Sequence, residues 1–308
     1  MTVGVEMPVS APSRRVADLR RSYLFLPGAD QAALAAGPAS GADVLIQELE
    51  DFTPPQRLPE ARELAPQVLA GWRKAGVLTA VRINPLDKRG NADLAAAMRG
   101  APDIVALPKV AEPAHVIALD EAVARLEREY GLPPDSTELL PNIELARGLI
   151  QTYAIAKASP RVKACLVASE DMAADLGAER GRDGIELLYV RQRFLVECVA
   201  AGVVAIDAPY TFSDDAGCEA EARFARRLGY RSKSCVAPAH AAPINRVLTP
   251  SSDEVARAER LIAAFEAARA RGAERADVDG NLVEVPSYLN AKRLVARAAS
   301  LAKAGGRT

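Results

Sequence analysis

Histidine is scarce in this sequence, with only two residues, His115 and His240, among 308. A histidine-rich zinc site is thereby excluded, and a Ser-His-Asp triad would have to use one of these two. Each histidine follows a Pro-Ala pair, which is typical of the first turn of a helix, so we expect both to be partly exposed helix residues. The four cysteines are widely scattered and form no CxxC pair, which predicts reduced thiols with a structural role.

A large charge excess and long apolar runs are also absent. The formal net charge is -1 and both signs are interleaved along the chain, which excludes the basic surface of a typical nucleic-acid-binding protein. No window approaches the roughly 18 unbroken apolar residues of a membrane span, and the first residues lack the apolar core of a signal peptide. We therefore expect a cytoplasmic protein that binds neither nucleic acid nor membrane.

Apolar residues make up 49% of the chain, so a substantial core is available although aromatics are only 5%. Short β-like runs alternate with longer runs of helical spacing. The β-like runs span residues 22–27, 43–49, 78–84, 103–108, 138–144, 162–168, 203–208 and 230–236. Strict alternation indicates parallel strands, because parallel neighbours need a crossover connection, and eight units predict a (β/α)8 TIM barrel. An open doubly wound sheet is the main alternative, which the lack of a GxGxxG or GxxxxGK turn disfavours.

The repeating pattern predicts three regions. We expect residues 1–18 to form a flexible tail, 19–250 the barrel, and 251–308 a C-terminal helix-hairpin-helix segment. The hairpin is indicated by an Asp-Gly-Asn sequence, whose residues tolerate the positive φ of a tight turn. Such a segment could serve as a lid or an oligomer contact, or it could simply pack against the barrel wall.

Charged side chains recur where the predicted strands end. In a TIM barrel the functional residues gather at these carboxyl ends. Bringing charges together away from water is costly unless they pair or bind ions, so a purely structural barrel does not need them to converge. In chain order they are Glu48, Glu50, Asp51, Arg82, Lys109, Glu144, Glu170, Asp171, Asp207 and Lys233.

Two of these acids, Glu144 and Asp171, follow adjacent predicted strands, so their carboxylates could reach one ion. Oxygen ligands without histidine or thiolate are typical of a hard cation, and Mg²⁺ commonly uses one or two carboxylates together with water and substrate. The residues alone leave other interpretations open. Asp171 could cap the helix that follows it, and Glu144 could pair with Arg147 along a helix.

Seven short motifs occur in an order that resembles a known enzyme family. They are RSYLFLPG, ELED, VRIN, LPKV, IELARG, SEDMAADLG and AIDAPY, within about residues 20–250, with a fainter match at VDGNLVEVP. The chain is similar to the citrate lyase β-subunit-like branch of the HpcH/HpaI aldolase family, which includes malyl-CoA and citramalyl-CoA lyases. The resemblance implies a (β/α)8 barrel and a Mg²⁺-dependent carbon–carbon lyase. Its substrate would be a 3-hydroxyacyl-CoA, cleaved reversibly to an acyl-CoA and a 2-oxo acid.

The same resemblance implies roles for particular residues. Glu144 and Asp171 match the family's metal ligands, and Arg82 matches the arginine that binds the 2-oxo acid. Glu284 stands where the family usually has an aspartate implicated in catalysis, on a C-terminal segment that reaches over a neighbour's site. We therefore expect a homotrimer or homohexamer, and we expect Glu144 and Glu170 to contact the substrate.

The base that removes the hydroxyl proton stays open between Glu50 and Asp51, either of which could instead orient water on the metal. The chain also departs from the family pattern, because Gln47, Glu48 and Ala237 stand where leucine, aspartate and histidine are usual. These departures leave alternatives to a CoA lyase. One is a 2-oxo-acid aldolase that does not use CoA, and another is a non-catalytic or partner-dependent citrate lyase β-like subunit.

Overall fold

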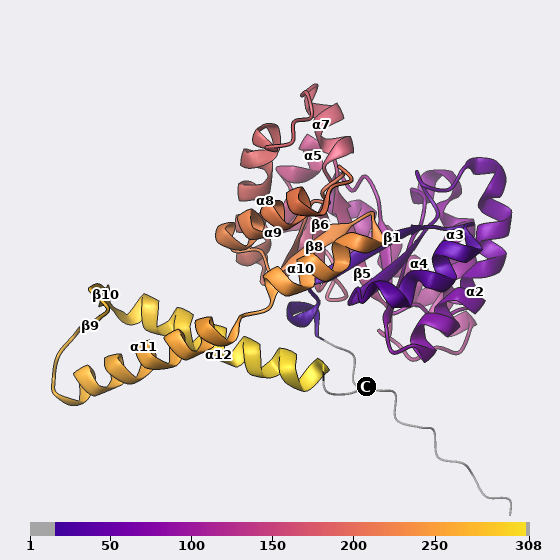
Figure 1. Ribbon diagram of the computed structural model, residues 1–308. Helices are drawn as coiled ribbons and strands as arrows, with labels where there is room; N and C mark the ends of the chain where they lie inside the picture. Colours follow the sequence, from indigo (N-terminus) through magenta and orange to yellow (C-terminus); the bar gives the residue numbers. More distant parts are fainter. Residues whose placement is uncertain (1–15, 306–308) are drawn as a thin grey trace, which may run out of the picture.

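The computed structural model describes residues 16–305 and contains a closed barrel of eight parallel strands (Figure 1). The strands are β1 (Ser22–Pro27), β2 (Val44–Glu48), β3 (Leu78–Arg82), β4 (Ile104–Leu107), β5 (Glu138–Ile143), β6 (Ala164–Val167), β7 (Val204–Asp207) and β8 (Ser232–Cys235). Each strand pairs with the next in sequence, and β1 closes the barrel against β8. The predicted (β/α)8 barrel is thereby confirmed, and the open sheet is excluded.

Helices connect consecutive strands and cover the outside of the barrel (Figure 1). They are α1 (Gln31–Ala36), α2 (Leu58–Lys74), α3 (Asn91–Met98), α4 (Pro113–Glu129), α5 (Ala146–Leu149), α6 (Thr152–Lys157), α7 (Glu170–Leu176), α8 (Leu188–Ala201), α9 (Asp215–Leu228) and α10 (Ala241–Leu248). Several begin with proline in the first turn, where its missing N–H leaves no helical hydrogen bond unmade.

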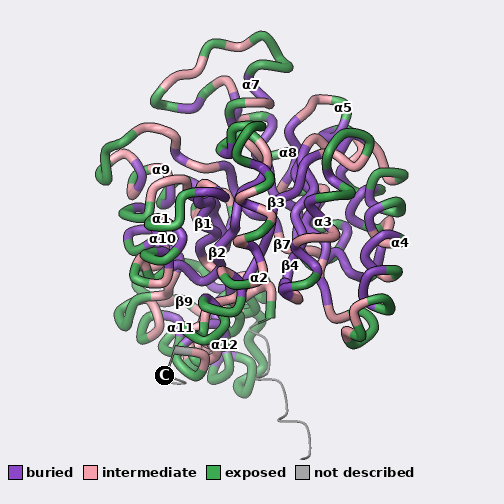
Figure 2. Tube along the Cα trace, turned by 90° about the vertical axis from the view of Figure 1, so that its right-hand side faces the viewer, coloured by how far each residue is buried: buried purple, intermediate pink, exposed green. Residues whose placement is uncertain are grey.

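Alternate residues of each strand face the barrel interior and the helix layer, as the period of two in a strand requires. A small apolar cluster that includes Phe25, Ile46 and Leu140 fills the interior. A larger cluster that includes Leu45 and Leu139 packs between the sheet and the helices. Figure 2 shows the strands almost entirely buried, with the exposed residues on the outer faces of the helices. Because both faces of the sheet are covered, any charged residue in a strand must find partners within the protein.

The C-terminal segment forms an arm of two helices joined by a short hairpin. Its elements are α11 (Ser252–Ala270), β9 (Ala276–Val278), β10 (Asn281–Val283) and α12 (Val285–Gly305). A capping box of Ser251 and Glu254 starts α11, and the hairpin turns through Asp279 and Gly280, both at positive φ. In both views the arm extends away from the barrel, at the end opposite α7 (Figures 1 and 2).

An ion pair and two hydrogen bonds connect the base of the arm to the rest of the chain. Arg226 of α9 binds Glu254 at 2.9 Å, and Arg297 of α12 donates to the backbone carbonyls of Asp18 and Arg231. Residues 17–19 form a short 3₁₀ helix, so the last part of the predicted tail is helical, whereas residues 1–15 lie outside the described residues. Within residues 16–305, none of the helices combines the length and the apolar character needed to cross a membrane.

Candidate active site

Three buried ionisable side chains lie inside the barrel at the carboxyl ends of β2, β3 and β5. They belong to Glu48, Arg82 and Glu144. The period of two explains their placement, because Glu48 follows the inward-facing Ile46 by two residues and Glu144 follows the inward-facing Leu140 by four. These three residues form the centre of the candidate site.

The guanidinium of Arg82 is fixed by an acid and two aromatic rings. Its Nε donates to Glu48 Oε1 at 2.8 Å, and it lies 5.0 and 5.8 Å from the ring centroids of Phe25 and Phe52. Burial alone would lower the pKa of Arg82, but the surrounding acids outweigh burial and raise it, so the positive charge is permanent. A rigid, charged guanidinium is well suited to binding a carboxylate through two hydrogen bonds.

The terminal nitrogens of Arg82 face two further acids. Nη1 lies 3.5 Å from Glu144 Oε1, and Nη2 lies 3.5 Å from Glu50 Oε2. Glu50 is placed there by Glu48, whose two oxygens accept the backbone N–H groups of Glu50 and Phe52, both at 2.6 Å. Glu48 therefore fixes both the arginine and the loop that follows β2.

Lys109, two residues beyond β4, joins the acids of different loops. Its Nζ binds Glu50 and lies 3.3 Å from Asp51 Oδ2. The same atom lies 3.7 Å from Asp171 Oδ1, while the backbone N–H donates to Glu144 Oε2 at 3.0 Å. The φ of Lys109 is 53°, a left-handed conformation that costs a non-glycine residue about 1 kcal/mol. This backbone brings its N–H and its side chain to the acids at once.

Acids outnumber bases in this cluster. Burial raises the pKa of Glu144 to about 7; Arg82 opposes this rise, while Glu50 and Asp171 add to it. Burial also raises the pKa of Glu50, whose Oε2 has no hydrogen-bond partner. A divalent cation bound between Glu144 and Asp171 would relieve this repulsion, and an all-oxygen donor set suits Mg²⁺.

Two carboxylates are enough for such a cation. Mg²⁺ usually retains several waters and binds one or two carboxylates together with substrate oxygens, without a complete protein cage. In the described part of the chain, no group of three or more Asp, Glu, His or Cys side chains is placed to hold a metal. Glu144 and Asp171 therefore fit an open magnesium site at the carboxyl ends of the strands.

The two alternative interpretations of these acids are wrong. Helix α7 begins one residue before Asp171, which therefore lies inside the first turn and does not cap the helix. Arg147 binds Glu112 at 2.5 Å and not Glu144. Both acids thus remain available for ligand binding.

Two predicted site residues lie away from the cluster. The carboxylate of Glu170 binds Arg180 at 3.1 Å and Thr211 at 2.7 Å, on the loops after α7 and β7. The hairpin of β9 and β10 forms the tip of the arm (Figure 1). Glu284 directly follows β10 and lies 3.5 Å from Arg275. Because the arm points away from the barrel of its own chain, Glu284 is not part of the acid cluster of that chain.

Asp207 and Lys233 were expected to lie with the other strand-end charges, but they do not lie in the candidate site. Asp207 follows the inward-facing Ile206 and therefore faces the helix layer, where Lys233 Nζ donates to it at 2.7 Å. Arg191 of α8 binds both oxygens of Asp207 at 2.8 Å, and Glu221 of α9 lies 3.1 Å from Lys233. This buried network is fully paired, and it connects the strands to the helices that cover them.

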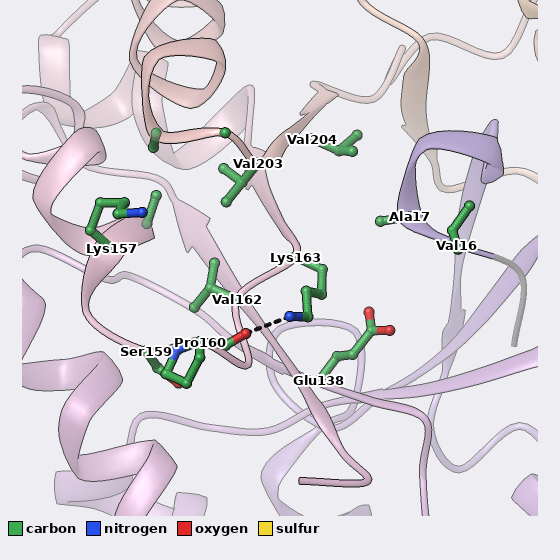
Figure 3. A pocket seen from close by; sticks show the side chains of 13 residues that line it. Val16, Ala17, Glu138, Lys157, Ser159, Pro160, Val162, Lys163, Val203 and Val204 are labelled. Carbon is green, nitrogen blue, oxygen red and sulfur yellow. Dashed lines mark hydrogen bonds between the residues drawn. The ribbon is translucent and has the colours of Figure 1, made fainter. Parts of the chain in front are cut away.

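A cavity of about 700 Å³ lies at the amino ends of the strands, away from the acid cluster (Figure 3). In its wall Lys163 donates to the backbone carbonyl of Pro160 at 2.7 Å, as Figure 3 shows. Glu138 at the start of β5 binds Arg20 through both oxygens. These polar groups are already paired, and functional residues of TIM barrels gather at the opposite end, so we do not assign the active site to this cavity.

The histidines and cysteines have structural surroundings. His115 is exposed in the first turn of α4, as predicted. The prediction of partial exposure is wrong for His240, which is buried because its ring packs against that of Tyr210, with the ring centroids 5.9 Å apart. Burial lowers the pKa of His240. All four cysteines are buried and free, as expected for reduced thiols.

Asn142 is a polar residue of the barrel interior that the sequence analysis missed. It lies two residues before Glu144 on the same face of β5, and it is buried with no hydrogen-bond partner for either atom of its side-chain amide. Buried amides are normally hydrogen-bonded, so this one is a candidate contact for water or substrate. A polar residue within an apolar strand, in phase with Glu144, is the signal that could have identified it.

Comparisons with known proteins identify the family of the chain. The sequence profile of the family described as HpcH/HpaI aldolase/citrate lyase matches residues 21–238, which include all eight strands of the barrel. The citrate lyase subunit beta of Leuconostoc mesenteroides subsp. cremoris is 32% identical over 279 residues, covering 90% of this chain and 92% of that protein. An L-malyl-CoA/beta-methylmalyl-CoA lyase of Cereibacter sphaeroides is 34% identical over 303 residues, covering 90% of this chain and 94% of that protein.

Solved structures share the fold and in part the sequence. The protein CitE of Mycobacterium tuberculosis, in complex with magnesium, acetoacetate and coenzyme A, has a TM-score of 0.73 at 28% identity, covering 91% of this chain and 98% of that chain. A citrate lyase from Burkholderia xenovorans shares the fold with a TM-score of 0.81 at 19% identity, covering 96% of this chain and 94% of that chain. With the profile match and the identities above 30%, the chain belongs to the HpcH/HpaI aldolase/citrate lyase family and is a carbon–carbon lyase by class.

Proposed function

We propose that the protein is a Mg²⁺-dependent lyase that cleaves a 3-hydroxyacyl-CoA, similar to malyl-CoA or citramalyl-CoA, into an acyl-CoA and a 2-oxo acid. The observation that carries this proposal is the convergence of Arg82, Glu144 and Asp171 around Lys109 at the carboxyl end of the barrel. The malyl-CoA lyases among its relatives support the substrate class. The magnesium and coenzyme A in the related M. tuberculosis structure support the cation and the thioester.

Arg82 is the proposed binding residue for the carboxylate of the 2-oxo acid. Glu48 and the rings of Phe25 and Phe52 hold its guanidinium in place, so little conformational freedom is lost when the substrate binds. Glu144 and Asp171 would hold Mg²⁺, which when bound supplies Lewis-acid polarisation of the oxo-acid carbonyl. Residues from β3, β5 and α7 thus orient one end of the substrate.

Glu50 is the more suitable of the two acids predicted as the base. Its carboxylate is buried beside Arg82, its pKa is raised by burial, and its Oε2 is free of hydrogen bonds. The side chain of Asp51 is 53% exposed and lies 3.3 Å from Lys109 Nζ. A base with a raised pKa, close to the substrate, accepts the hydroxyl proton more readily at neutral pH. We therefore assign proton removal in the cleavage direction to Glu50.

Turnover by the purified chain tests the proposed function. We expect that Mg²⁺, acetyl-CoA or propionyl-CoA, and a panel of 2-oxo acids give a condensed 3-hydroxyacyl-CoA, detected by mass spectrometry. Product formation should stop on addition of EDTA and return with excess Mg²⁺. A product formed from 2-oxo acids without CoA would instead identify an aldolase. Turnover only with added acyl-carrier partners would identify a citrate lyase β-like subunit, a second candidate that its similarity to such subunits supports.

We also propose that Glu284 acts in a neighbouring subunit of a homotrimer or homohexamer. It directly follows the hairpin at the tip of an arm that points away from its own barrel (Figure 1). Leu282 and Val285, which flank it, are 57% and 42% exposed. A second copy of the chain that packs on the tip would cover these two apolar side chains.

Mixed oligomers test whether Glu284 acts between subunits. Asp171→Ala and Glu284→Ala chains are each expected to be nearly inactive alone. Oligomers formed by co-expressing the two are expected to regain a measurable part of the activity, because an intact Asp171 site then receives an arm with an intact Glu284. The exposed Glu259→Ala change on the same arm is the control and should leave activity unchanged. Mixed oligomers as inactive as their parents would contradict the proposal.

A further inference from the structure

Lys109 contacts both proposed metal ligands and both acids of the loop after β2. Its backbone N–H donates to Glu144 Oε2 at 3.0 Å, and its ammonium lies 3.7 Å from Asp171 Oδ1. The same ammonium binds Glu50 and lies 3.3 Å from Asp51 Oδ2. The side chain is 29% exposed, and its ammonium lies where the carboxylates of the loop after β2 and of α7 meet.

The ammonium of Lys109 lies close to the place that a divalent cation bound to Asp171 would occupy. A divalent cation on Asp171 would share that carboxylate with Lys109, and two positive charges this close repel each other. The lysine stem is flexible, and its ammonium already has Glu50 and Asp51 as partners on the other side. Loss of the longest of its contacts, the one to Asp171, is therefore the least costly way for Lys109 to accommodate a metal.

We infer that Lys109 is a built-in counter-cation that competes with Mg²⁺ for Asp171. Its positive charge stabilises the acid cluster in the metal-free protein. The same charge lowers the affinity of Glu144 and Asp171 for the metal. When metal binds, Lys109 stays with Glu50 and Asp51 and so holds the loop after β2 in place. This inference rests on the proposed Mg²⁺-dependent function and adds a residue that sets the metal affinity.

Metal titration of the full-length protein tests this inference without measuring activity. Wild-type protein, Lys109→Met and Lys109→Arg are titrated with Mn²⁺ by electron paramagnetic resonance and with Mg²⁺ by calorimetry. Lys109→Met is expected to bind either metal at least about tenfold more tightly, because the competing charge is gone. Lys109→Arg keeps the charge and should remain close to wild type. Lys157→Met, an exposed change at the opposite end of the barrel, is the matched control.

Thermal unfolding gives the second readout. In EDTA, Lys109→Met is expected to melt at a lower temperature than wild type, and saturating Mg²⁺ should raise its melting temperature by more than that of wild type. Equal or weaker metal binding by Lys109→Met, or an equal loss of stability with and without metal, would overturn the inference and leave the lyase proposal standing. Absence of metal binding by wild type would overturn both. If Lys109→Met does not fold, Lys109→Gln supports the same comparison, because it keeps a hydrogen-bond donor near Glu50.

Discussion

Replacing Asp171 by alanine is expected to lower kcat/KM of the Mg²⁺-dependent reaction at least about a thousandfold, equivalent to about 4 kcal/mol of transition-state stabilisation. The change removes one of the two carboxylates proposed to hold the cation, so Glu144 alone is expected to bind it much more weakly. The fold should be unaffected, because Asp171 is only partly buried and its contact with Lys109 is long, at 3.7 Å. Steady-state kinetics measures the loss of kcat/KM, and circular dichroism checks that the fold is unchanged.

The control for this experiment is Glu179→Ala, an exposed acid on the loop that follows α7. It removes the same charge from the loop that follows the helix of Asp171, without touching the acid cluster, so activity should stay within about twofold of wild type. A comparable loss of activity in Glu179→Ala would mean that net charge, not metal binding, explains the effect. Full activity of Asp171→Ala would show that Asp171 is not a metal ligand.

The barrel could be predicted from sequence because its signals are local and repeat eight times. Apolar strands and helices of regular length alternate, and β1 was predicted with the bounds observed, 22–27. Strand ends are less certain. The sixth strand was predicted at 162–168, but β6 covers Ala164–Val167, because Val162 makes only an isolated bridge to Leu139. The end of a strand depends on where its pairing with a neighbouring strand stops. That neighbour is distant in sequence, so the local sequence does not show where the strand ends.

The sequence could not predict whether each charged side chain at a strand end faces the barrel interior or the helices. Strands of a parallel barrel are covered on both faces, so they carry no polar–apolar alternation that would reveal which residues face inward. Glu144 and Asp207 both stand at strand ends, yet Glu144 faces the interior and Asp207 faces the helices. The left-handed backbone of Lys109 is equally invisible, because lysine has no preference for that conformation. The structure therefore places Glu144 in the candidate site and Asp207 in a separate network, although both acids have the same position at a strand end in the sequence.

Asp207→Ala is expected to lower the free energy of unfolding by about 3–5 kcal/mol, because removing one partner of a buried ion pair leaves the others uncompensated. Lys233 and Arg191 are both buried and both depend on this carboxylate, at 2.7 and 2.8 Å. The loss is large against a typical stability of about 5–15 kcal/mol. Urea unfolding followed by circular dichroism measures it, with the exposed Asp87→Ala as a control that should change the value by less than about 0.5 kcal/mol.

The pH dependence of stability provides an independent check on Asp207. Burial alone would raise its pKa, but Lys233 and Arg191 outweigh burial and hold the pKa of Asp207 below its ordinary value of 3.8. A carboxyl group with a lowered pKa in the folded state contributes stability above its unfolded pKa, and that stability is lost as the pH falls through the folded value. We expect Asp207→Asn to be less stable than wild type at pH 7 and to lose less stability between about pH 4 and pH 2. If Asp207→Asn lost as much stability as wild type between about pH 4 and pH 2, Asp207 would not be held ionised by Lys233 and Arg191.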